Sequence, residues 1–189
     1  TSNTFTTTLE VTTNNGCIHS TPISTIVNDL TVAAFTFVNG CFNTEIQFTE
    51  TASSNSSTYF WDFGDGTNST LQNPSHLYAS ASDFLVKLLV STGSTGCLDS
   101  ITQIITTYPL PIPSFSAANT CISEQVNFND QSSILAPATL TNYAWSFGDG
   151  NTSNQSAPSN LFAAEGVYDV QLILTSNHGC IDSLSQQVT

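Results

Sequence analysis

The stretch Trp61-Asp-Phe-Gly-Asp-Gly66 recurs 84 positions later as Trp145-Ser-Phe-Gly-Asp-Gly150. In both copies, a Trp and a Phe alternate with other residues, as in a β-strand that buries one face. The Gly-Asp-Gly that follows predicts a tight turn, because glycine accepts positive φ and Asp caps nearby backbone N–H groups. The chain therefore contains a repeated β unit.

Other features recur with nearly the same period. Three cysteines each follow a glycine after an alternating strand: Cys17, Cys97 and Cys180. Two more, Cys41 and Cys121, stand 80 residues apart. This spacing predicts that residues 1–29 are the last two strands of a preceding repeat. Residues 30–109 and 110–189 are then two complete repeats.

Each repeat is expected to fold as a β-sandwich. Runs with a period of two are separated by breakers such as Asn39-Gly40 and Asn73-Pro74. About seven short strands, with a Trp on the third, are typical of an immunoglobulin-like sandwich. No segment predicts a helix, so the expected fold is all-β, with tandem immunoglobulin-like sandwiches.

The motif order resembles that of the PKD domain. W-x-F-G-D-G is followed by Asn73-Pro-Ser-His in one copy and by Ala157-Pro-Ser-Asn in the other, and then by an alternating strand. The Asn-Gly-Cys and Gly-Cys turns resemble PKD arrays of large Bacteroidota surface proteins. The resemblance implies a PKD-type sandwich that serves as a spacer or adhesion module, in surface proteins or beside secreted hydrolases.

The composition narrows the functional classes. The 189 residues include one basic residue, Lys87, and carry a net charge of -13. Such a chain repels nucleic-acid phosphates and anionic membrane surfaces. No apolar run approaches the roughly 20 residues that cross a bilayer. No signal peptide is present, so we interpret the chain as a segment of a secreted or cell-surface protein.

The motif residues have two interpretations each. The two Trp residues suit either core packing or sugar stacking, and their alternating strands favour the core. The acidic turns suit either turn chemistry or a calcium site, and Asp62 becomes Ser146 in the second copy, which argues against a shared site. We expect structural roles and no cofactor, with calcium as the alternative, for Trp61, Phe63, Gly64, Asp65, Gly66, Trp145, Phe147, Gly148, Asp149 and Gly150.

The five cysteines predict disulfides, since regularly spaced cysteines in a secreted chain usually pair. In an immunoglobulin-like sandwich, the turns that carry Cys41 and Cys97 lie at opposite ends, about 20–25 Å apart. A disulfide needs Cα atoms within roughly 7 Å. End-to-end stacking of repeats instead predicts an inter-repeat bond between Cys41 and Cys180. Cys17, Cys97 and Cys121 would then pair outside this chain.

Two further signals are short. Asp99-Ser100-Ile101 and Asp182-Ser183-Leu184 resemble the O-glycosylation signal of Bacteroidota, which makes Ser100 and Ser183 candidate sites. The histidines, His19, His76 and His178, accompany no evident nucleophile and carboxylate, which disfavours a catalytic triad.

We therefore expect a protein segment without enzymatic activity. The main interpretation is a structural or adhesive segment of an extracellular filament or stalk, rigidified by disulfides. Its partners would be adjacent copies of the repeat, in the same chain or in neighbouring subunits, with a glycan or surface protein as target. The alternative is a non-catalytic glycan- or protein-binding accessory module of a secreted hydrolase, which would need a row of exposed aromatic residues.

Overall fold

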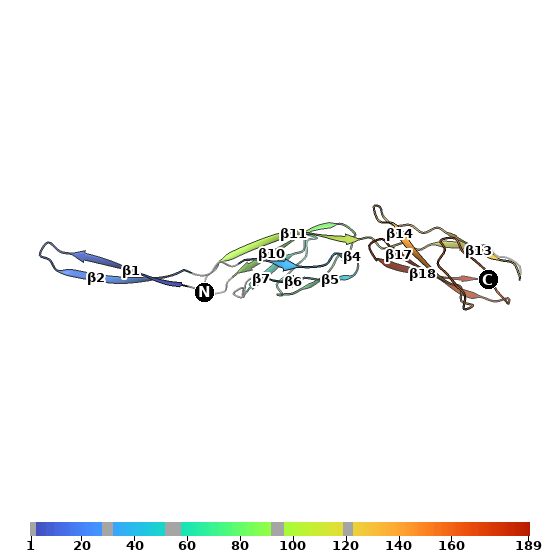
Figure 1. Ribbon diagram of the computed structural model, residues 1–189, viewed down its shortest axis with the longest axis horizontal. Helices are drawn as coiled ribbons and strands as arrows, with labels where there is room; N and C mark the ends of the chain where they lie inside the picture. Colours follow the sequence, from blue (N-terminus) through green and yellow to red (C-terminus); the bar gives the residue numbers. More distant parts are fainter. Residues whose placement is uncertain (1–2, 28–31, 52–57, 92–96, 119–122) are drawn as a thin grey trace. The chain divides into compact units, whose positions relative to one another are not determined.

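The computed structural model describes residues 3–27, 32–51, 58–91, 97–118 and 123–189. Its ordered elements are all strands (Figure 1), which confirms the all-β prediction. By proximity, the chain divides into two compact units: residues 1–36, 49–74 and 86–103, and residues 37–48, 75–85 and 104–189. Among the described residues, no helix is long and apolar enough to cross a membrane.

A β-hairpin comes first. Strand β1 (Asn3–Thr12) pairs antiparallel with β2 (Ile18–Val27), with Leu9 opposite Thr21. Gly16, at φ +81°, lies in the turn between them. Every described side chain of this hairpin is exposed.

The next strands form a sandwich around Trp61. One sheet has the order β4 (Gly40–Cys41), β11 (Leu98–Tyr108), β10 (Asp83–Ser91), β7 (Thr58–Asp62) and β8 (Asn68–Ser69). Two strand pairs complete the fold: β3 (Phe35–Thr36) with β6 (Thr49–Glu50), and β5 (Glu45–Gln47) with β9 (Ser75–Leu77). The buried residues come from alternate positions, such as Val86, Leu88 and Val90 on β10.

The second sandwich repeats this plan. Its larger sheet has the order β15 (Thr152–Ser153), β14 (Leu140–Ser146), β17 (Tyr168–Ser176) and β18 (Ile181–Val188). Its smaller sheet joins β12 (Phe115–Ala117), β13 (Val126–Asp130) and β16 (Ser159–Asn160). The core between them is one cluster: Phe115, Val126, Phe128, Trp145, Phe147, Val170, Leu172, Leu174 and Val188.

Strand interruptions raise the number of elements above the expected seven in the first repeat, where β3 to β11 are nine. Only Phe48 separates β5 from β6, and the two pair with different strands. The chain also changes partner between β3 and β4, because β3 pairs with β6 whereas β4 pairs in parallel with β11. These are single strands broken where they change partner, so the immunoglobulin-like plan holds.

Candidate functional site

The repeated Trp residues occupy the cores of the two sandwiches. Trp61 and Trp145 are 0% and 2% exposed. Each indole N–H donates a 2.9 Å hydrogen bond to the carbonyl ten residues further on, at Leu71 and Gln155. The Phe two residues after each Trp stacks beside it, with ring centroids 6.5 and 6.3 Å apart. A buried indole with a satisfied N–H packs the core, so neither ring offers a sugar-stacking platform.

The acidic turns are held by local hydrogen bonds. Asp65 accepts bonds from the backbone N–H and hydroxyl of Thr67, and Asp149 accepts one from the N–H of Asn151 at 2.9 Å. The flanking glycines all have positive φ: Gly64 +79°, Gly66 +90°, Gly148 +80° and Gly150 +96°. The turn interpretation accounts for this geometry, since side-chain capping and positive φ are what such turns require.

The two glycines of the second turn make a matched pair for a test. A Cβ on Gly148 would lie 2.8 Å from the Asp169 carbonyl oxygen, whereas a Cβ on Gly150 would meet nothing within 4 Å. We expect Gly150→Ala to cost about 1–2 kcal/mol for the backbone conformation alone. Gly148→Ala should cost about 1–3 kcal/mol more, because backbone atoms must move. Urea unfolding of both variants measures the difference, and equal losses would contradict the role assigned to the close approach.

Asp149 is surrounded by amide donors. Its carboxylate accepts bonds from Asn160 Nδ2 at 2.8 Å and Asn151 Nδ2 at 2.9 Å. Partial burial by itself raises the pKa of Asp149, but the hydrogen bonds from Asn160 and Asn151 outweigh it and lower the pKa below its ordinary value. Asn160 is itself buried and accepts from Asn151. The two asparagines thus occupy three hydrogen-bonding positions of this carboxylate.

This lowered pKa predicts an acid-sensitive second sandwich. A carboxylate whose pKa is lower in the folded state adds stability above its unfolded pKa of about 4, and that stability is lost as pH falls through the folded value. Urea unfolding of wild type and Asp149→Asn from pH 6 to pH 2.5 tests this. We expect the wild type to lose more stability than the variant below about pH 4. Parallel curves would show that Asp149 contributes nothing to the acid response.

Metal ligands do not gather elsewhere in the described ranges, which hold no group of three or more His, Cys, Asp or Glu side chains placed to bind an ion. The expectation of no cofactor, with calcium as the alternative, stays a prediction.

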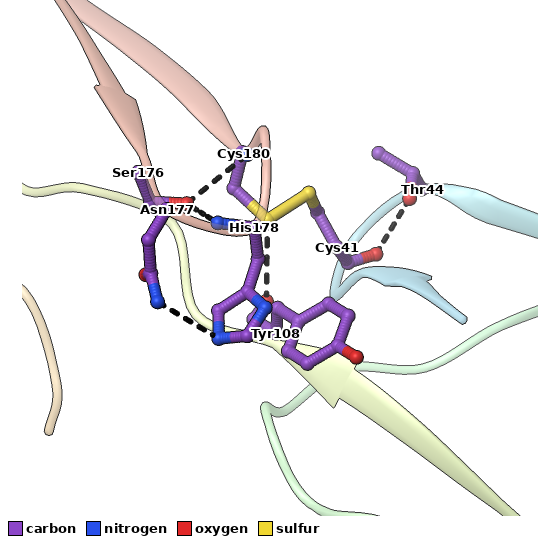
Figure 2. The surroundings of a disulfide bond; sticks show 7 residues. All are labelled: Cys41, Thr44, Tyr108, Ser176, Asn177, His178 and Cys180. Carbon is purple, nitrogen blue, oxygen red and sulfur yellow. Dashed lines mark hydrogen bonds between the residues drawn. A yellow bond between two sulfur atoms is a disulfide. The ribbon is translucent and has the colours of Figure 1, made fainter. Parts of the chain in front are cut away.

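A disulfide joins Cys41 to Cys180, the pair expected from end-to-end stacking (Figure 2). The Cα atoms lie 5.7 Å apart, and 139 positions separate the two residues along the chain. Both residues belong to the second compact unit. Cys180 is fully buried and Cys41 is half-buried. The bond therefore ties a strand of the first repeat to the β17–β18 turn of the second.

Main-chain pairing places Cys41. Strand β4 runs parallel to the end of β11, with Cys41 level with Tyr108, and the N–H of Phe42 donates to the Tyr108 carbonyl at 3.0 Å. Cys97 precedes the first residue of β11. Eleven residues at about 3.3 Å each put it roughly 36 Å from Cys41 along that strand. The pairing of Cys41 with Cys97 is thus sterically excluded.

Contacts on the other side place Cys180. Its N–H donates to Ser176 Oγ at 3.1 Å, and the N–H of Ser176 donates to the Cys180 carbonyl at 2.8 Å. Its Sγ, which carries no proton, packs 3.9 Å from the Tyr108 carbonyl oxygen. The rings of Tyr108 and His178 stack beside the bond, with centroids 3.8 Å apart and planes 4° from parallel (Figure 2). Tyr108 thus supports the linkage by both backbone and ring.

The remaining predicted sites are located separately. Cys17 is exposed in the hairpin turn, Cys97 is half-buried, and Cys121 lies outside the described residues. Their pairing outside the chain stays a prediction. Ser100 and Ser183 are both exposed. Their neighbours differ: Asp99 accepts a 2.8 Å bond from the N–H of Ala33, while Asp182 accepts from the N–H of Ser183.

Two adjoining surface hollows lie in the second compact unit, with volumes of about 470 and 520 Å³. Both are lined by Ala81, Pro109 and Leu135, and the first also by Tyr108 and His178. Thr107, which lines the first hollow, is buried. Its hydroxyl donates to the Ser80 carbonyl at 2.8 Å and accepts from the N–H of Ser82 at 3.0 Å. The sequence analysis did not identify this surface; its one signal was the run of prolines at positions 109, 111 and 113.

Comparison with known proteins gives relatives for part of the chain. It is 30% identical over 73 residues to collagenase ColA of Clostridium perfringens, which covers 39% of this chain and 7% of that protein. It is 33% identical over 58 residues to the microbial collagenase of Vibrio alginolyticus, covering 31% and 7%. The chain thus spans a small fraction of these relatives. None of them is a Bacteroidota protein, so that origin stays a prediction.

Solved structures give a similar result. The chain is 28% identical to the PKD1 domain of Vibrio anguillarum Epp, with a TM-score of 0.39, covering 42% of this chain and 90% of that one. The PKD1 domain of the Vibrio cholerae metalloprotease PrtV matches with the same identity and TM-score, covering 42% and 94%. The pattern of the family described as "PKD domain" matches residues 31–107 and again residues 109–189. These two matches span most of the sequence, and the chain therefore belongs to the PKD domain family.

Proposed function

We propose that the chain is a non-catalytic accessory module of a longer secreted hydrolase. The observation that carries this proposal is the match to short segments of two collagenases, each about 7% of the relative's length. The repeated motif residues also support the assignment of a non-catalytic module, because their side chains pack the two cores or form the turns. An extracellular location follows from the same proposal.

The hollows around Leu135 are the surface that such a module would use to bind protein or glycan. Their walls combine aliphatic side chains, prolines and the Tyr108 ring, and Leu135 is an exposed apolar residue shared by both. Binding sites are commonly concave and mostly apolar, with a few polar groups. Exposed aromatic residues do not form a row here; the site is one stacked pair beside an aliphatic hollow.

Sedimentation with insoluble matrices tests this function. The purified chain would be mixed with fibrillar collagen and, separately, with cellulose. We expect one matrix to retain it, Leu135→Asp to reduce retention at least ~5-fold, and Leu161→Asp to leave retention unchanged. Leu161 is the matched control because it is also exposed but lies outside both hollows. Failure to bind either matrix, or equal loss in both variants, would refute the proposed surface.

A structural stalk is the second candidate, and the Cys41–Cys180 disulfide favours it. Domains joined by a linker and modest contacts move relative to each other by default, and a covalent tie restrains that motion. Electrophoresis of native material with and without reductant distinguishes two forms of stalk. A large species that collapses on reduction means separate chains tied through further cysteines such as Cys17. An unchanged size means a single polypeptide.

A further inference from the structure

One wall of the two hollows is built by a loop that the first repeat has in a shorter form. Fifteen positions separate Asp130 from Trp145, whereas 11 separate the equivalent residues Glu50 and Trp61. Leu135, which lines both hollows, lies in the longer segment and is 63% exposed. The lining residues all lie between positions 42 and 182, so this surface is formed within the two complete repeats.

This loop is fixed at both of its ends. Before Leu135, the backbones of Ile112 and Ser133 exchange two hydrogen bonds, of 2.8 and 3.1 Å. After it, the N–H of Asn177 donates to the Thr139 carbonyl at 2.9 Å, and the N–H of Thr139 donates to Asn177 Oδ1 at 3.0 Å. A wall that is held in this way needs little ordering when a ligand binds, which favours affinity.

The walls suit apolar side chains better than sugar rings. A sugar stacks on the open face of an aromatic ring, but the half-buried Tyr108 ring of the first hollow has His178 stacked on one face (Figure 2). The walls that both hollows share are aliphatic: Ala81, Pro109 and Leu135. Such walls are stabilised when an apolar side chain removes them from water. A polypeptide segment therefore fits this surface better than a glycan.

Two carboxylates give this surface its charge. Asp83 lines the first hollow and Asp182 the second, and the linings contain no lysine or arginine. Both side chains are exposed, and they accept hydrogen bonds from Thr106 Oγ1 and from the N–H of Ser183, each at 2.7 Å. The chain as a whole carries a net charge of -13. A cationic segment is therefore attracted to this surface, and an acidic segment is repelled.

We propose that the two hollows bind an extended segment of a partner protein that carries both apolar and basic residues. This inference rests on the proposed function, because it names the ligand class of the same surface. An apolar side chain of the segment packs beside Leu135 and Pro109, and its lysines or arginines lie near Asp83 and Asp182. The apolar contact supplies most of the affinity, and the charges speed association and discriminate against acidic segments.

Fluorescence anisotropy with defined peptides tests this ligand class. The probe is a fluorescein-labelled peptide of Leu-Pro-Lys repeated three times, in which the prolines keep the chain extended. Matched peptides carry glutamine or glutamate in place of lysine. We expect the lysine peptide to bind the full chain with a micromolar Kd, the glutamine peptide to bind at least ~5-fold more weakly, and the glutamate peptide not to bind. Equal binding of the lysine and glutamine peptides, or no binding of any peptide, would overturn the proposal.

A pair of double variants locates the charge effect. Asp83→Asn/Asp182→Asn should weaken binding of the lysine peptide at least ~5-fold, and asparagine keeps the oxygen that accepts each local hydrogen bond. Glu124→Gln/Glu165→Gln removes the same charge at exposed positions outside both hollows and should change binding less than ~2-fold. Equal effects of the two double variants would mean general attraction to an acidic chain, which contradicts the assigned site.

A pair of leucine variants separates this inference from the proposed function. Leu135→Ser should weaken binding of the lysine peptide at least ~5-fold, while Leu161→Ser, outside both hollows, should change it less than ~2-fold. Retention on collagen or cellulose that depends on Leu135, without binding of any peptide, would overturn this ligand class and leave the proposed function standing. Loss of both peptide binding and matrix retention would remove the proposed function as well.

Discussion

Replacing Trp145 by alanine should lower the free energy of unfolding of the second sandwich by about 3–5 kcal/mol, the range measured for large aromatic residues deleted from cores. Trp145 is 2% exposed, and its ring contacts Phe115, Phe128 and Phe147 at centroid distances of 5.0, 5.6 and 6.3 Å. The variant creates a cavity among these rings and removes the donor to the Gln155 carbonyl. Such a loss approaches the whole stability of many domains, which is about 5–15 kcal/mol.

Urea unfolding followed by circular dichroism measures this loss. Trp145→Phe is the matched control, because it keeps an aromatic ring in the core and removes the N–H; we expect a loss of about 1–2 kcal/mol. Phe60→Ala, at an exposed position on β7, should change stability by less than about 1 kcal/mol. A Trp145→Ala variant as stable as the wild type would place the ring at the surface and revive the sugar-stacking interpretation.

Removal of the Cys41–Cys180 bond should have the second large effect. A cross-link between residues 139 positions apart restricts the unfolded chain strongly. Its loss typically costs about 2–5 kcal/mol. We expect the double variant Cys41→Ser/Cys180→Ser to melt at a lower temperature than the wild type, and reduction of the wild type to lower its melting temperature similarly.

The control and the chemical check are direct. Cys17→Ser should leave the stability within about 0.5 kcal/mol, because Cys17 lies exposed in a hairpin turn. A peptide map of the unreduced protein should contain a peptide pair joined through Cys41 and Cys180. Recovery of Cys41 joined to Cys97 would contradict both the structure and the stacking argument.

The fold could be predicted from the sequence because the patterns that indicate it lie within short stretches and occur in both repeats. The period-two alternation and the Gly-Asp-Gly turns predict strands and turns from a few neighbouring residues. The exclusion of Cys41–Cys97 followed from the expected sandwich topology together with strand length. These are properties that short stretches of sequence carry.

Other features depend on contacts between distant residues and had no signature in the sequence. The parallel pairing of β4 with β11 arises where the chain changes sheets, which alternation does not reveal. The stack of Tyr108 on His178 joins residues 70 positions apart, and the hydroxyl of Thr107 bonds to residues 25 and 27 positions away. The first hollow around Leu135 is formed by four separate segments: residues 81–83, 106–109, 135–138 and His178. The prolines at positions 109 and 111 line the second hollow, but a run of prolines does not by itself indicate a surface hollow.

The position of the disulfide also affects how the protein responds to cleavage. The bond closes a covalent ring through residues 41–180. A protease that cuts one exposed loop inside this ring opens a peptide bond, but the two pieces remain attached through the sulfur atoms. The nicked molecule then keeps its strands at high local concentration, so that they stay paired. In surroundings rich in secreted proteases, a single cut would therefore leave this segment joined, and two cuts or a cut with reduction would be needed to release a fragment.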